Sequence, residues 1–155
     1  MAITWFAAVK EVSGLFKDIG GLVAKSNATK KLLYSELELN LKQFQNAYKT
    51  KATYDQLIEV LSNERITKAR ESAFIFSTIK AGKIKESHVK DPRNKRYIGE
   101  DCEWLFINIA DKIEELKGLK KMNNGTLEGI TTMNMPLQFS NLFYKLKLLV
   151  AFIKS

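Results

Sequence analysis

The stretch PLQFSNLFYKLKLLVAFIK, residues 136–154, decides the fold class of this chain. Its apolar residues recur at intervals of three and four, which places them on one face of an α-helix. Pro136 suits the first turn of that helix, where a backbone N–H has no helical partner to lose. We therefore predict a helix over residues 136–154 whose core stripe is Phe139, Leu142, Phe143, Leu146, Leu149, Val150 and Ile153.

The same periodicity predicts four further helices, over residues 3–24, 28–50, 54–81 and 100–117. Ser26 or Asn27 can cap the second helix, and Thr53 with Gln56 has the spacing of a capping box at the start of the third. The apolar stripe of the third helix steps by five residues from Leu61 to Ile66. Such a phase slip predicts a kink or break near residues 62–63.

Composition favours a helical bundle over a β-fold. The chain has 155 residues, 45% of them apolar, which is enough for a core, but only 2 prolines and 8 glycines. A sandwich or barrel needs a turn signal roughly every ten residues. We predict an all-α, single-domain bundle of about five helices spanning residues 1–155, with a long basic loop between the third and fourth helices.

Residues that carry chemistry are scarce in this sequence. With one histidine, His88, and one cysteine, Cys102, the chain cannot build the usual zinc sites, and no glycine pattern matches a phosphate-binding loop. We expect no metal site, no cofactor and no catalytic residues. The single cysteine, the absence of a secretory signal pattern and the lack of a spanning apolar run predict a cytoplasmic protein.

Positive charge is concentrated between residues 80 and 97. That segment holds seven basic and two acidic residues, a net +5 of the chain's +8, and Pro92 interrupts regular structure within it. Such a loop can neutralise phosphates, with arginine and tyrosine adding contacts to bases, or it can simply be a solvated surface loop. The candidate anion-binding or nucleic-acid-binding residues are Lys83, Lys85, His88, Lys90, Arg93, Lys95, Arg96 and Tyr97.

Apolar residues also exceed what one stripe per helix requires. Trp5 and Phe6 lie near the start of the chain, and Leu148 and Phe152 lie off the main stripe of the last helix. They either complete the core or form an interface with a protein partner or a second copy of the chain. Peripheral contact with a membrane is disfavoured, because Glu11 and Asp18 reduce the positive charge of the first helix.

These observations lead to two functional hypotheses. The first is a non-enzymatic assembly or accessory protein that binds a protein partner or itself through apolar helix faces. The alternative is a nucleic-acid-binding module that uses the basic loop, residues 83–96, including a metal-independent RNase centred on His88. RNases of the HEPN group carry an arginine four to six residues before their histidine, and His88 has none at that spacing.

Overall fold

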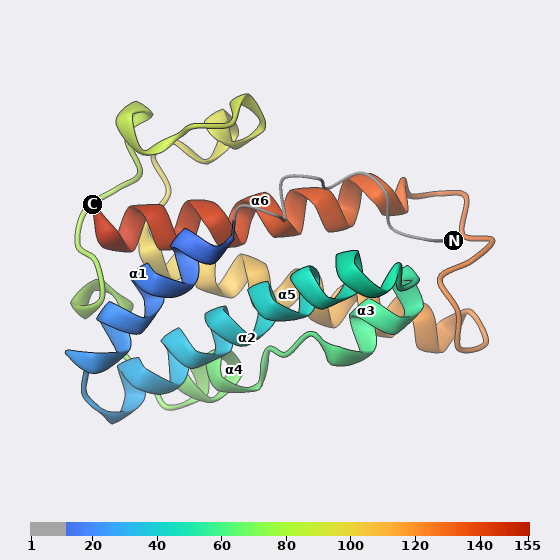
Figure 1. Cartoon of the computed structure of the whole chain (residues 1–155), viewed down its shortest axis with the longest axis horizontal. Helices are drawn as coiled ribbons and strands as arrows, with labels where there is room; N and C mark the ends of the chain where they lie inside the picture. Colours follow the sequence, from blue (N-terminus) through green and yellow to red (C-terminus); the bar gives the residue numbers. More distant parts are fainter. Residues whose placement is uncertain (1–11) are drawn as a thin grey trace.

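A computed structural model describes residues 12–155, and Trp5 and Phe6 lie outside this range. Within it the chain is helical, without a β-strand, which confirms the all-α prediction. Between residues 12 and 155, six α-helices and three short 3-10 helices follow one another along the chain, as Figure 1 traces. They are α1 (Ser13–Ala24), α2 (Ala28–Thr50), α3 (Tyr54–Val60), α4 (Glu64–Glu71), η2 (Phe76–Thr78), η3 (Glu86–His88), η4 (Pro92–Tyr97), α5 (Cys102–Met122) and α6 (Met135–Lys154).

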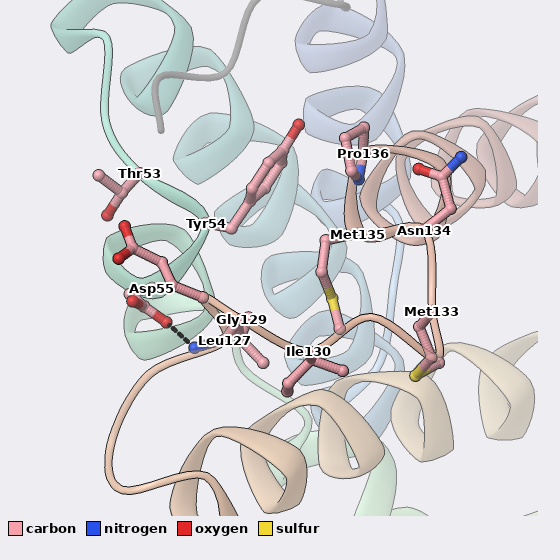
Figure 2. Close-up of a pocket in the computed structure, with 11 residues that line it drawn as sticks. Thr53, Tyr54, Asp55, Leu127, Gly129, Ile130, Met133, Asn134, Met135 and Pro136 are labelled. Atoms are coloured by element: carbon pink, nitrogen blue, oxygen red, sulfur yellow. Dashed lines mark hydrogen bonds between the residues drawn. The ribbon is translucent and has the colours of Figure 1, made fainter.

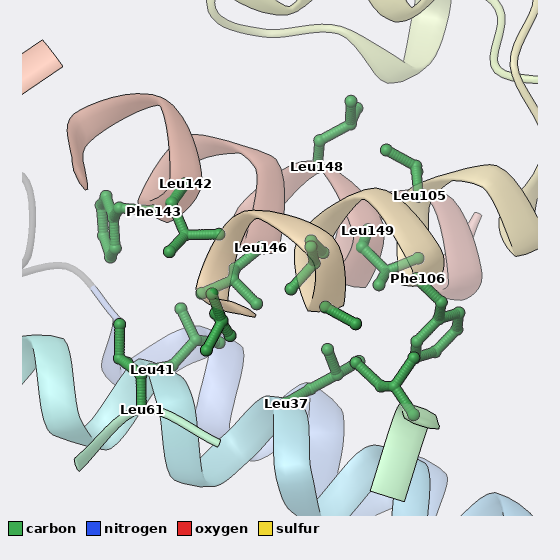
Figure 3. Close-up of a cluster of buried hydrophobic side chains, with 14 of the residues drawn as sticks. Leu37, Leu41, Leu61, Leu105, Phe106, Leu142, Phe143, Leu146, Leu148 and Leu149 are labelled. Carbon is green, nitrogen blue, oxygen red and sulfur yellow. The ribbon is translucent and has the colours of Figure 1, made fainter. Parts of the chain in front are cut away.

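The long helices enclose one continuous apolar core. Helix α1 packs on α2 and α6, α5 packs along α6, and α3 and α4 lie against α2 and α5. Leucine and phenylalanine side chains of α2, α5 and α6 meet between these helices, as Figure 3 shows for Leu37, Phe106 and Leu146. All seven residues of the stripe predicted for α6 are buried. Periodicity therefore identified the core-facing side of this helix correctly.

The predicted capping interactions form. Asn27 accepts a hydrogen bond from the Lys30 amide at 3.1 Å and so caps α2. At the start of α3, the Thr53 hydroxyl accepts from the Gln56 amide while the Gln56 side chain accepts from the Thr53 amide. Both contacts satisfy backbone donors that a helix terminus leaves unpaired.

The single helix predicted over residues 54–81 is instead two helices followed by a 3-10 turn. The helical conformation is interrupted after α3, at the phase slip. Glu36 and Asn40 of α2 stabilise this interruption by hydrogen bonding to its backbone. The Glu36 carboxylate accepts the amides of Arg65 and Ile66, at 2.7 and 3.1 Å, and thereby caps α4 from another helix. Asn40 exchanges two hydrogen bonds of 2.8 Å with the backbone of Ser62.

Helix α4 ends at Glu71, ten residues before the predicted end. Ala73 adopts a left-handed conformation with φ of 55°, which a continuing right-handed helix cannot include. Helix α5 runs past its predicted end at residue 117, through Gly118, to Met122. Its last turn is held by Lys120, whose side chain donates to the Asp55 carbonyl and pairs with Glu59. Contacts with α3 thus extend α5 beyond the glycine.

Candidate functional site

The basic segment, which we define as residues 80–97, is folded and docked on α6. In Figure 1 it is the yellow-green stretch beside the C-terminal half of α6. Its two ends are joined, because the Ile84 amide donates to the Glu100 carbonyl and the Gly99 amide donates to the Ile84 carbonyl, both at 2.9 Å. Gly82 and Gly99 have φ of 83° and 96°, a region that glycine enters without strain. The segment predicted as a long basic surface loop is therefore closed at its ends, and it contains two short 3-10 helices, η3 and η4.

Arg93 is the main anchor of the basic segment. Its guanidinium lies over the Tyr144 ring, donates to the Ser140 hydroxyl, and pairs with Asp91 through Nε at 3.1 Å. These contacts occupy the arginine within the fold. Ser140 and Tyr144 both belong to α6, so Arg93 joins the middle of the basic segment to that helix.

Asn94 and Tyr97 complete the anchor. The Asn94 carboxamide donates to the Tyr144 carbonyl at 3.2 Å, and only 4% of the residue is exposed. Tyr97 is 7% exposed, with its ring 5.5 Å from that of Trp104. A buried ring cannot stack on a nucleobase, so the base contact expected of Tyr97 is absent from this conformation.

His88 also turns towards the protein. Its Nδ1 accepts a hydrogen bond from the Lys85 amide at 2.9 Å, and its ring lies 5.1 Å from that of Phe152, edge to face. These contacts give the imidazole a structural role in η3. Of the eight predicted site residues, His88, Arg93 and Tyr97 thus hold the segment in place.

The other five predicted site residues form the outer surface of the basic segment. They are all exposed, and none of them forms an ion pair with another residue in the range 12–155. The Arg96 guanidinium lies over the Tyr97 ring, 4.9 Å from its centroid, and Arg96 as a whole is exposed. We call these residues the cationic set: Lys83, Lys85, Lys90, Lys95 and Arg96.

The interface predicted at Leu148 and Phe152 does not fit the folded chain. Leu148 is 3% exposed and Phe152 is 1% exposed. Figure 3 shows that Leu148 points to the side of α6 away from α2, where the basic segment covers the helix. The apolar surplus of α6 is therefore buried within the chain, where α1 and the basic segment both pack on this helix. Trp5 and Phe6, the other two predicted interface residues, fall outside the described residues.

Sequence reasoning missed most of the α6 residues that receive the basic segment, and of them it named only Leu148, as an interface candidate. Ser140, Tyr144, Lys147, Leu148 and Ala151 recur at intervals of one to four residues, which forms a second face of the helix beside the main stripe. That mixed polar and small-residue face was the available signal. It did not reveal which segment would cover it.

A separate cavity of about 210 Å³ lies between the start of α3 and the connection from α5 to α6 (Figure 2). Its walls include Ile130, Met133 and Met135. The Asp55 carboxylate beside it accepts the Leu127 amide and the Thr126 hydroxyl, each at 2.6 Å. Asp55 therefore fixes the connecting loop, and the chemistry of this cavity is mainly apolar.

Buried ionisable groups lie elsewhere in the bundle. Burial, with Asp101 close by, raises the pKa of the Cys102 thiol to about 12, so the cysteine is un-ionised at neutral pH. Burial lowers the pKa of Lys145 to about 8, helped by the nearby charges of Lys112 and Arg96. No three potential metal ligands gather within residues 12–155, and no helix there is long and apolar enough to cross a bilayer.

Comparison of the chain with protein-family models, with curated proteins and with solved structures finds no match.

Proposed function

We propose that this protein binds nucleic acid through the phosphate backbone, using the cationic set on the basic segment. The observation that carries the proposal is that the segment contains two groups of residues, one that anchors it and one that is exposed and cationic. His88, Arg93, Asn94 and Tyr97 fix it to the protein, while five cations remain exposed and without ion-pair partners in the described structure. A pre-ordered array of cations loses less conformational entropy on binding than a mobile loop does.

The geometry favours binding with little sequence preference. Lysine and arginine side chains at a surface recognise phosphates, whereas specificity requires contacts to base edges or stacking on exposed aromatic rings. Tyr97 is buried and Tyr144 lies beneath Arg93. If each of the five cations neutralises one phosphate, the slope of log K against log salt on duplex DNA is no steeper than about −4 to −5.

The test is fluorescence anisotropy of a labelled single-stranded RNA and a labelled DNA duplex, titrated at several salt concentrations. A variant with Lys83, Lys85 and Lys95 all replaced by Gln should bind more weakly, with a slope shallower by about 2 to 3. The matched control replaces Lys49, Lys68 and Lys121 by Gln, which removes the same charge from other exposed positions. Equal losses in both variants, or no binding by the wild type, would reject the proposal.

Self-association through an apolar helix face, the first hypothesis from the sequence, is supported by one feature of the structure, an exposed apolar pair on α2. Leu32 and Leu39 are 43% and 41% exposed and lie seven residues apart on α2, hence on the same face of the helix. We expect a second copy of the chain to be the occupant of such a face. Light scattering after size exclusion tests this: Leu39→Glu should leave a monomer if the wild type is a dimer, and a monomeric wild type removes the idea.

A further inference from the structure

A cavity of about 360 Å³ lies where the basic segment meets α6 and α1. Its volume falls within the range of small-molecule sites, roughly 300 to 1,000 Å³. It is separate from the outer surface of the cationic set, and only Lys90 belongs to both. Part of its wall is apolar, formed by Leu15 of α1 and by Leu148 and Ala151 of α6.

The cavity carries an excess of positive charge. Lys90 and Lys147 line it, and Lys90 is exposed, so it lies at the mouth. Among the described residues of the wall, Asp91 is the one carboxylate, and it is already paired with Arg93 at 3.1 Å. His88 also lines the cavity, and because its Nδ1 accepts the Lys85 amide, its Nε2 is the ring nitrogen that can donate. An anionic group is thus favoured beside these residues.

One residue of the wall, Asn94, carries a buried and unsatisfied acceptor. Its Oδ1 has no hydrogen-bond donor among residues 12–155, while its Nδ2 donates to the Tyr144 carbonyl. A buried acceptor without a donor costs free energy, so a ligand that supplies an N–H there is favoured. The exocyclic amino group of a nucleobase supplies such a donor, whereas an alkyl chain does not.

From these three features we propose that the cavity binds a nucleoside monophosphate unit, either free or at the phosphorylated end of a nucleic-acid chain. The phosphate lies between Lys90 and Lys147, the base lies against the apolar wall, and its amino group donates to Asn94. This inference deepens the proposed function and rests on it. It adds an end-recognition site to a surface that binds the backbone along its length.

The direct test is calorimetric titration of AMP, CMP, GMP and UMP into the full chain, with dissociation constants below about 1 mM expected for nucleotides with an exocyclic amine. UMP should bind most weakly, because uracil has no such amine. Adenosine and inorganic phosphate each supply half of the contacts and should bind at least about tenfold more weakly than AMP. The side-chain amide resonances of Asn94 should shift on AMP addition.

Two variants locate the site. Ala151→Trp fills the apolar half of the cavity and Lys147→Gln removes a phosphate partner, and each should weaken AMP binding by about tenfold or more. Ala28→Trp is the matched control, because it adds the same side chain at an exposed position on α2. Thermal unfolding of all three variants checks that they fold, and Lys147→Gln keeps the test valid if Ala151→Trp does not.

Two oligonucleotides that differ only in a 5′-phosphate distinguish free nucleotides from chain ends. Preference for the phosphorylated oligonucleotide, lost in Ala151→Trp, assigns the cavity to chain ends, whereas AMP binding without that preference assigns it to free nucleotides. The inference is overturned if AMP does not bind, or if Ala151→Trp and Lys147→Gln both bind AMP as the wild type does. It is also overturned if dodecanoate occupies the cavity and nucleotides do not. The variant in which Lys83, Lys85 and Lys95 are replaced by Gln retains Lys90 and Lys147. Loss of binding to the nucleic-acid backbone and loss of AMP binding are therefore separate outcomes.

Discussion

The guanidinium of Arg93 lies 4.0 Å from the centroid of the Tyr144 ring, and this contact fastens the basic segment to the middle of α6. The surrounding contacts to Asp91 and Ser140 make Arg93 part of the fold rather than of the free cationic surface.

We therefore predict that Arg93→Gln lowers the free energy of unfolding by about 1 to 3 kcal/mol, because a cation–π contact and charge-assisted hydrogen bonds are lost together. Lys95→Gln, an exposed neighbour in the same 3-10 helix, should change it by less than about 0.5 kcal/mol. Urea unfolding measures both. Amide exchange should quicken across residues 84–98 in Arg93→Gln alone, and equal stability of the two variants would contradict the anchoring role.

Phe152→Ala should cost about 3 to 5 kcal/mol, since Phe152 is 1% exposed and its removal leaves a cavity in a packed interior. The His88 ring rests on Phe152, so the basic segment should also loosen. Leu137→Ala, at a residue that is 48% exposed, is the control on the same helix and should be nearly neutral. A folded, fully stable Phe152→Ala would return this residue to the list of interface candidates.

Glu36→Gln should destabilise the fold by about 1 to 3 kcal/mol, because one carboxylate oxygen that accepts a backbone amide is replaced by a donor. The pH dependence follows from burial, which raises the pKa of Glu36 above its ordinary value of 4.5 despite the hydrogen bonds from Arg65, Ile66 and Ser62. The folded chain then holds this proton more tightly than the unfolded chain does. Its stabilising contribution is complete below pH 4.5 and is lost as the pH rises through the folded pKa.

The stability difference between wild type and Glu36→Gln should accordingly widen as the pH falls from neutral towards 4.5. Chemical unfolding of both proteins across this range measures it, and the other carboxylates cancel in the difference. A gap that narrows on acidification would show that the hydrogen bonds outweigh burial.

Lys145→Met should stabilise the protein by about 1 to 3 kcal/mol at pH 7, because an apolar side chain of similar shape replaces a buried cation. Lys145 is 4% exposed and donates to Asn108, and its pKa falls from 10.5 to about 8 on burial. The folded chain therefore holds this proton less tightly than the unfolded chain. The free energy of unfolding of the wild type should therefore rise relative to that of the variant as the pH rises from about 8 to 10.5. Thermal unfolding in that range checks this.

Local patterns predicted the parts of the fold that local interactions determine. The stripe from Phe139 to Ile153, the Asn27 cap and the capping box at Thr53 are read from residues within one helix. The break near Ser62 was visible as a phase slip, but the Glu36 carboxylate that caps α4 lies about 30 residues earlier, and no local pattern records that contact.

The candidate site was predicted only as a set of charges. Residue types identified the basic segment, whereas its division into anchors and exposed cations depends on Ser140 and Tyr144, which lie about 50 residues later in the chain. Arginine and lysine look equivalent in a charge count. The fold separates the basic residues one by one, since Arg93 is held against α6 while Lys95 and Arg96 remain in solvent.

The order of synthesis makes docking of the basic segment a late event. Arg93 leaves the ribosome 47 residues before its partner Ser140, and Asn94 leaves 50 residues before Tyr144. At a translation rate of about 5 to 20 residues per second, α6 is synthesised roughly 2 to 10 seconds after the segment that docks on it. Throughout that interval residues 80–97 carry their net charge of +5 without the contacts that Arg93 and Asn94 later make to α6.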